Sequence, residues 1–173
     1  MLKSFKKYMI VILFIILTYA WVWMGTYFRT KKYYKQACMN YDDEKYMIAL
    51  KGERILNESQ SGYIFQGGFQ QVMEAWNNPF ALPKPSIYTN SIKMIDNIIN
   101  FKIDIAEGQK IFKTYFKMDN KFLPEVLLRI GDLQFDQGQT DKSIETYQLI
   151  INAFGHNKEI AELAKSKLNK LIK

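Results

Sequence analysis

The longest apolar run of the chain lies near its N-terminus. Residues 8–28, YMIVILFIILTYAWVWMGTYF, contain no charged side chain over 21 positions. At a rise of about 1.5 Å per residue, such a helix is about 31 Å long, which matches a bilayer hydrocarbon core of about 30 Å. Tryptophan and tyrosine favour the membrane–water interface. We therefore expect a single transmembrane helix over 8–28, anchored in the lipid bilayer by Tyr8, Trp21, Trp23 and Phe28.

A cleaved signal peptide is the alternative interpretation of this run, with Thr18-Tyr19-Ala20 as a small-residue cleavage site. The apolar run continues past that site through Met24, which favours an uncleaved anchor. The basic residues on its two sides nearly balance, with Lys3, Lys6 and Lys7 in the tail 1–7 and four basic residues over 29–35. A short basic start before an apolar run is typical of a signal anchor. We expect the C-terminal domain outside the cytoplasm (in the periplasm if the protein is bacterial), and the opposite orientation stays open.

Beyond the anchor, apolar residues recur at spacings of three and four, which predicts helices and no strand. Asp42 is a candidate N-cap for a helix over 43–57. Three of the four prolines fall within 77–86, which predicts a loop. The expected organisation is a juxtamembrane helix pair over 29–62, a helix and Pro-rich loop over 63–86, and a helical domain over 87–173.

The C-terminal stretch has the clearest pattern. Pro124 suits the first turn of a helix, Gly138 breaks that helix, and Thr140 or Asp141 can cap the next one. A last helix is expected over 158–172, with lysines at its C-terminal end that complement the helix dipole.

Residues 124–157 resemble a tetratricopeptide repeat. The resemblance rests on small residues where two helices approach closely, on large apolar residues and on a helix-ending glycine: Leu127, Ile130, Gly131, Gly138, Ser143, Ile144 and Tyr147. Gln134, Ile150 and Gly155 depart from the usual aromatic residue, alanine and proline of the family. Helix 158–172 is similar to the closing helix that follows a last repeat. Residues 36–57 and 87–117 are either degenerate repeats or unrelated packed helices.

The resemblance implies an all-α fold in which antiparallel helix pairs stack into a solenoid whose concave face binds a peptide or a partner's helix. It implies packing roles for Leu127, Ile130, Gly131, Gly138, Ser143 and Tyr147. It does not name the partner.

The net charge and the candidate catalytic or metal-binding residues change this prediction little. The net charge is +7, but residues 1–35 hold seven basic residues and no acid, which leaves 17 basic and 17 acidic residues in 36–173. A nucleic-acid-binding domain needs a basic face, so we expect no nucleic-acid partner. His156, the single histidine, falls in a predicted turn, and Cys38 is the single cysteine. We expect no catalytic residue, metal, cofactor or small-molecule ligand, and therefore no enzyme.

Aromatic residues cluster around the proline loop: Tyr63, Phe69, Trp76 and Phe80. They either pack the loop onto its own helices or, where exposed, form a partner-binding surface, because tryptophan and tyrosine dominate interface hot spots. The leading hypothesis is a membrane-tethered scaffold or adaptor, a non-catalytic subunit of a membrane or envelope assembly. The alternative is a receptor or chaperone-like module that captures a peptide or preprotein.

Overall fold

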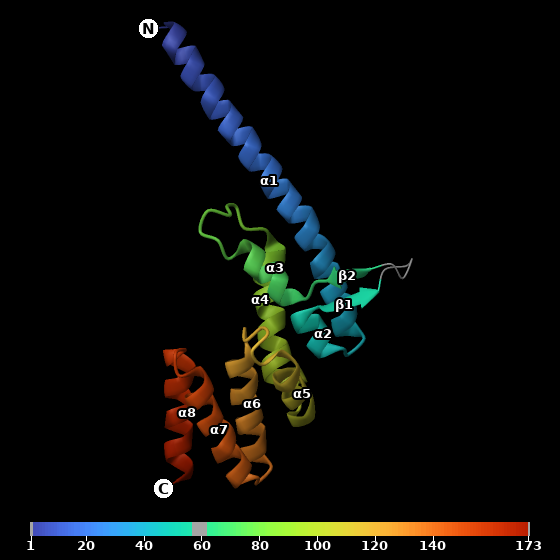
Figure 1. Ribbon diagram of the computed structural model, residues 1–173, viewed down its shortest axis with the longest axis vertical. Coiled ribbons are helices and arrows are strands. Elements are labelled where there is room, and N and C mark those ends of the chain that lie inside the picture. Colours follow the sequence, from blue (N-terminus) through green and yellow to red (C-terminus); the bar gives the residue numbers. More distant parts are fainter. Residues whose placement is uncertain (1, 57–61, 173) are drawn as a thin grey trace. The chain divides into compact units, whose positions relative to one another are not determined.

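The computed structural model describes residues 2–56 and 62–172, with side chains from Tyr8 onward in those ranges (Figure 1). The chain is mostly helical and divides into two units, residues 1–95 and 96–173. The end of the predicted juxtamembrane helix pair over 29–62 lies outside the described residues at 57–61. The mostly helical class predicted from the sequence is confirmed, with one correction, a β-hairpin.

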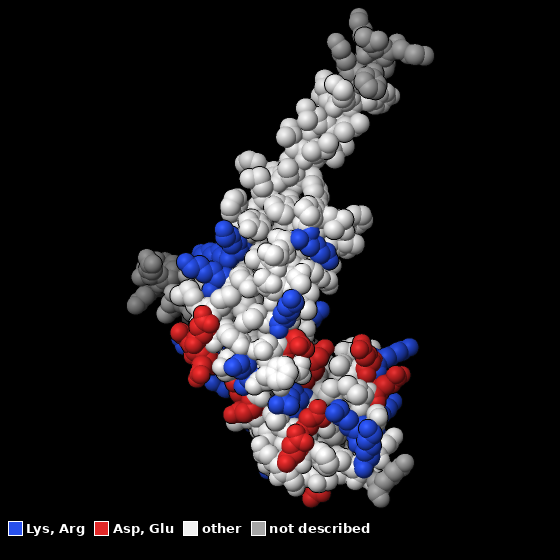
Figure 2. Space-filling model, turned by 180° about the vertical axis from the view of Figure 1, so that it is seen from behind, with Lys and Arg blue, Asp and Glu red and all other residues white. Residues whose placement is uncertain are grey.

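The first element of unit 1 is one long helix, α1 (Leu2–Asp42), without the break that the sequence left open after residue 28. It is the one helix in the described part of the chain that is long and apolar enough to cross a membrane, a property that signal sequences share. Figure 2 shows the described shaft of this helix free of charged side chains before it reaches the rest of unit 1.

The two halves of α1 have different surroundings. All 15 residues of 8–22 are exposed. From Trp23 onward one face packs against unit 1, and Thr30 and Ala37 are both 0% exposed. The same helix is therefore an uncovered apolar rod in its first half and a core element in its second.

Both predicted bounds of the helix over 43–57 are wrong. Helix α1 runs through Asp42, and a turn in which Glu44 has a φ of 60° leads into α2 (Tyr46–Lys51). Asp42 is thus no N-cap. Helix α2 stops at Gly52, whose φ of 70° suits a residue without a Cβ atom.

A two-stranded antiparallel hairpin replaces the remaining predicted helix residues. Strand β1 (Glu53–Leu56) pairs with β2 (Tyr63–Gln66), with Ile55 opposite Ile64. After β2 the chain passes close to α2. A Cβ atom on Gly68 would lie 2.7 Å from the carbonyl oxygens of Ala49 and Leu50. The glycines therefore permit a backbone contact that a helix over 64–76 would not make.

Helices α3 (Phe69–Trp76) and α4 (Ser86–Asn97) complete unit 1, and the division between the units falls within α4. The residues between them, 77–85, form the segment that we call the proline loop. Val72, Trp76 and Ile87 form a buried cluster, against which Trp23 and Tyr27 of α1 pack. The core of unit 1 thus lies between α1, α3 and α4.

Unit 2 contains the short π-helix η1 (Ile98–Lys102) and the helices α5 (Ile105–Tyr115), α6 (Leu123–Asp136), α7 (Thr140–Phe154) and α8 (Lys158–Leu171). Pro124 lies in the first turn of α6, and Gly138, with a φ of 74°, follows its end, as predicted. Gln139 is the N-cap of α7, so the capping prediction for Thr140 or Asp141 is wrong. Helices α5 to α8 each contact the next helix along the chain.

Helices α6 and α7 approach closely at the two small residues. Ser143 Oγ donates a 2.8 Å hydrogen bond to the Gly131 carbonyl, and the ring of Tyr147 lies over Gly131. Gln134 is 3% exposed and accepts a 2.7 Å bond from Thr146 Oγ1. Leu127 and Ile130 are buried. A polar partner for Gln134 explains why an aromatic residue is not needed there.

We expect Gly131→Val to destabilise the protein by about 1–3 kcal/mol, because a Cβ atom there would lie 2.5 Å from the Tyr147 ring. The ring is buried and cannot swing out. The matched control is Gly25→Val, since a Cβ atom at Gly25 meets nothing within 4 Å. Denaturation of the full chain in a mild detergent, followed by circular dichroism, measures both. Equal stability of the two variants would contradict this packing.

Candidate functional site

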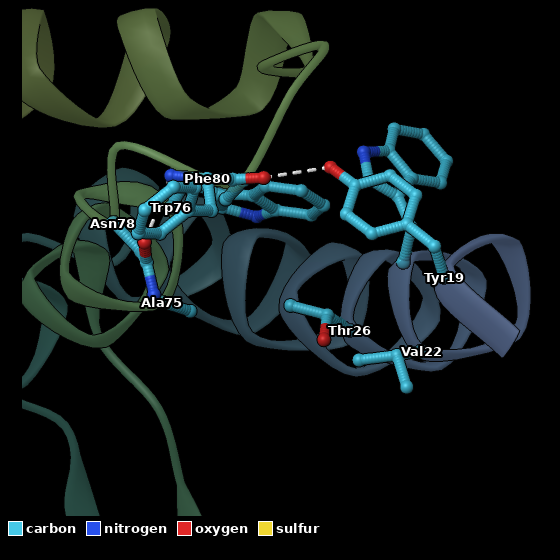
Figure 3. A pocket seen from close by; sticks show the side chains of 9 residues that line it. Tyr19, Val22, Thr26, Ala75, Trp76, Asn78 and Phe80 are labelled. Carbon is cyan, nitrogen blue, oxygen red and sulfur yellow. Dashed lines mark hydrogen bonds between the residues drawn. The ribbon is translucent and has the colours of Figure 1, made fainter. Parts of the chain in front are cut away.

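The proline loop docks on α1 through side-chain hydrogen bonds. The Tyr19 hydroxyl lies 2.7 Å from the Phe80 carbonyl oxygen and 2.6 Å from that of Leu82, and it accepts a 2.9 Å bond from the Leu82 N–H (Figure 3). Trp23 Nε1 donates a 3.0 Å bond to the Pro83 carbonyl. The loop therefore lies along the apolar part of α1.

Below the loop, aromatic rings join α1 to α3. Trp23 stacks on Tyr27 with ring centroids 5.4 Å apart, and its other contact is an edge-to-face pair with Trp76 at 5.4 Å. Trp76 Nε1 donates a buried 2.9 Å hydrogen bond to Thr30 Oγ1. The Trp76 indole is thus held both by ring packing and by a hydrogen bond, which is the usual state of a buried tryptophan.

A cavity of about 220 Å³ remains between the loop and the helix. Tyr19, Val22, Thr26, Ala75, Trp76 and Phe80 are among its lining residues, and Figure 3 shows their side chains around the gap. The cavity is mainly apolar, and its lining residues include no Asp, Glu, His, Lys or Arg. It can accept an apolar side chain or an acyl chain.

The structure separates the four aromatic residues proposed as a partner-binding surface. Trp76 and Phe69 are 1% and 0% exposed and serve the core of unit 1. Phe80 and Tyr63 are 80% and 73% exposed, on the proline loop and on β2. A role in binding remains a prediction only for the two exposed residues.

The four predicted anchor residues all lie on α1. Tyr8, Trp21 and Phe28 are exposed, Trp21 the most, at 81%. Trp23 is half-buried because it packs on Trp76 and Tyr27. Three of the four side chains are therefore free to meet lipid, and the fourth faces the protein.

Unit 2 carries a second candidate site, a groove of about 400 Å³ between α6 and α8 with Tyr147 of α7 at its side. Its lining residues are Arg129, Asp132, Phe135, Asp136, Tyr147, Lys167, Lys170 and Leu171. Phe135 is 48% exposed. Basic, acidic and apolar side chains thus share one groove, a composition suited to an amphipathic peptide.

A small polar network lines this groove. Asp132 Oδ1 accepts a 2.6 Å hydrogen bond from the Tyr147 hydroxyl and forms a 2.8 Å ion pair with Lys167 Nζ. Burial, and the bond to Asp132, raise the pKa of Tyr147 well above its usual value, so the phenol stays neutral. Asp132 is thus engaged with both Tyr147 and Lys167 on the side of α6 that lines the groove. The network joins three helices, α6, α7 and α8, through Asp132, Tyr147 and Lys167.

Sequence reasoning missed the residues that create both sites. Tyr19 was interpreted as an interfacial aromatic residue or as part of a cleavage site, and Lys167 as a dipole complement. The available signal for the first was the polar hydroxyl of a tyrosine midway along a charge-free segment. The second had no local signal, because Asp132 and Lys167 are far apart in sequence.

The comparisons with known proteins leave these sites to be interpreted from their own geometry. No protein-family model, no curated protein and no solved structure matches the chain.

Proposed function

We propose that the chain is a single-pass membrane protein whose helical part binds another protein, as a non-catalytic scaffold of a membrane or envelope assembly. One observation carries this proposal: the exposed, charge-free residues 8–22 of α1 continue without a break into a part of the helix that is built into the core of unit 1. Exposed apolar surface on that scale favours contact with lipid or another apolar phase. The tether and the folded unit share one helix.

This arrangement also favours the uncleaved anchor over a signal peptide. Cleavage after Ala20 would remove Tyr19, whose hydroxyl binds the proline loop at both Phe80 and Leu82. It would make Trp21 the first residue and leave the packed residue Trp23 only two positions after it. A segment that is to be discarded gains nothing from such contacts.

We expect the full chain to stay in the membrane pellet after extraction with alkaline carbonate, because the charge-free run 8–28 of α1 spans the bilayer. We also propose that the C-terminal part lies outside the cytoplasm. In a Cys38→Ser background, Met39→Cys is then labelled by a membrane-impermeant maleimide in intact cells, since Met39 is 59% exposed. Release by carbonate would contradict the tether, and labelling only after lysis would reverse the orientation.

For unit 2 we propose a tetratricopeptide-like helix-pair fold, with the groove between α6 and α8 as the partner-binding face. The close contact of Gly131 with Tyr147 and the Ser143–Gly131 hydrogen bond support it, because the family places small residues at such an approach. Phe135, exposed between charged side chains, is the candidate anchor for a partner's apolar residue.

Phe135→Ala is expected to abolish partner capture without unfolding the protein, because a half-exposed ring contributes little to the core. The matched control is Leu163→Ala on α8, a residue that is 44% exposed and does not line the groove. Each tagged variant is purified from native membranes after mild crosslinking and analysed by mass spectrometry. A fixed-ratio set of proteins, lost only with Phe135→Ala, is the expected result.

Other outcomes of this purification decide between the functions. A broad range of unfolded or preprotein clients, together with binding of free peptides in solution, would support a receptor or chaperone-like module. Equal loss of partners in both variants would remove the groove from the proposal. Recovery of the protein alone would contradict the scaffold.

A further inference from the structure

The proline loop exposes apolar side chains on a segment that has no acidic residue. Phe80 is 80% exposed and Leu82 is 57% exposed. Residues 77–85 read NNPFALPKP, with Lys84 as their only charge. Adjacent exposed apolar residues on a loop indicate a surface that contacts something other than water.

The position of the loop along α1 indicates what that contact is. Its hydrogen bonds reach Tyr19 and Trp23, and Tyr19 lies nine positions before Phe28, where the charge-free run ends. At about 1.5 Å per residue, the point at which the loop meets α1 lies about 13 Å from Phe28 toward the N-terminus. The 15 uncovered residues of 8–22 span only about 22 Å, whereas a bilayer core needs about 30 Å. A bilayer crossed by α1 therefore extends past the point at which the loop begins.

The loop backbone is prepared for a medium without water. Proline has no N–H group, and the loop has three prolines. The Phe80 N–H bonds to Asn78 Oδ1, the Ala81 N–H bonds to the Asn78 carbonyl, and the Leu82 N–H bonds to Tyr19. The Pro83 carbonyl accepts a bond from Trp23 Nε1. The single hydroxyl proton of Tyr19 lies within reach of both the Phe80 and the Leu82 carbonyl, and the Phe80 carbonyl also accepts a bond from the Leu82 N–H. Non-helical backbone is tolerated at membrane depth only where its polar groups find such partners in the protein.

We propose that the proline loop is a membrane-inserted element, in which Phe80 and Leu82 enter the apolar part of the leaflet that the second half of the α1 run crosses. This inference rests on the proposed membrane tether. Lys84 Nζ, two residues after Leu82, lies 4.5 Å from the centroid of the Tyr88 ring. We expect this charged end of the loop to lie at the headgroups of that leaflet, as lysines near an interface do. The occupant of the exposed loop surface is lipid.

The test is a set of single nitroxide labels in the full chain, reconstituted into vesicles of zwitterionic and anionic phospholipids. Cysteines replace Phe80 or Leu82 in the Cys38→Ser background. Ile15→Cys, within the apolar half of α1, and Met39→Cys, eleven positions past Phe28, are the lipid and water references. All four side chains are exposed, so labelling leaves the core intact. Power saturation then compares collisions with oxygen, which enters lipid, and with a water-soluble nickel chelate.

We expect the labels at 80 and 82 to behave like the label at 15, with collisions with nickel several-fold rarer than at 39. Labels at 80 and 82 that match position 39, while position 15 lies in lipid, would overturn the loop inference and leave the tether standing. Nickel access at position 15 would overturn both. Shielding of 80 and 82 from both reagents would indicate that protein, not lipid, covers the loop, and would also overturn the inference.

Discussion

Replacing Trp76 with alanine is expected to lower the free energy of unfolding by about 3–5 kcal/mol, the usual cost of truncating a buried aromatic residue. The indole is 1% exposed, meets the Trp23 ring at 5.4 Å and bonds to Thr30 Oγ1 at 2.9 Å. Its loss would open a cavity between α1 and α3. Because domains are stable by only about 5–15 kcal/mol, unit 1 should lose much of its structure.

The matched control is Trp21→Ala, the same truncation on α1 at a residue that is 81% exposed. Denaturation of the full chain in a mild detergent, followed by circular dichroism, should show no comparable loss for it. Trp76→Phe isolates the hydrogen bond to Thr30 from most of the packing, and we expect it to cost about 1 kcal/mol. If the Trp76→Ala variant were as stable as Trp21→Ala but no longer bound its partner protein, Trp76 would be an interface residue. Its burial in the core of unit 1 would then be wrong.

Phe154→Ala should destabilise unit 2 by a similar amount, about 3–5 kcal/mol. The ring is 1% exposed at the end of α7, and it makes edge-to-face contacts with Phe112 at 6.5 Å and Phe116 at 6.1 Å. Such aromatic pairs contribute beyond the area that they bury. Truncation therefore removes the contact between α7 and the C-terminal end of α5.

Phe101→Ala removes the same ring from a residue of unit 2 that is 72% exposed, so it should change stability by no more than about 0.5 kcal/mol. Phe154→Leu retains most of the volume and tests the ring contacts alone. Both are measured in the same denaturation experiment. A Phe154→Ala variant as stable as Phe101→Ala would show that α7 does not depend on this aromatic cluster.

The helical spacing of apolar residues predicted most elements, because long segments repeat the pattern several times. The buried residues of α7 follow this helical spacing, because Ser143, Tyr147, Ile150 and Phe154 lie four, three and four positions apart. The prediction used Ile144 and Ile151, which are only half-buried, and missed Phe154. Two apolar faces overlap there, and only packing against α5 and α6 selects one.

The hairpin was missed because each strand has only four residues, too few for an alternating pattern to stand out from a helical one. The informative residues were glycines. Gly52 adopts a positive φ, and Gly68 passes close to the backbone of α2. Gly52 was placed inside the predicted helix over 43–57, and Gly68 inside the predicted helix and Pro-rich loop over 63–86. Close approach of backbones distant in sequence is decided by tertiary structure, and a single sequence marks it only by an unexplained glycine.

The candidate sites were predictable in part. The aromatic content of the proline loop pointed to that region, but not to which rings face outward, because Trp76 and Phe80 differ in burial by their position around the end of α3. The groove in unit 2 depends on Asp132, Tyr147 and Lys167 meeting from three helices. No local pattern encodes that meeting.

The continuity of α1 has a mechanical consequence. No flexible linker separates the apolar half from Thr30 and Ala37, which are buried in unit 1. A helix that crosses a bilayer tilts to match the thickness of the hydrocarbon layer. If α1 spans a bilayer as we propose, the rest of unit 1 must tilt with it as one rigid body. The angle at which unit 1 stands on the membrane would then depend on the lipids around it, and a partner that requires one angle would bind best in membranes of one thickness.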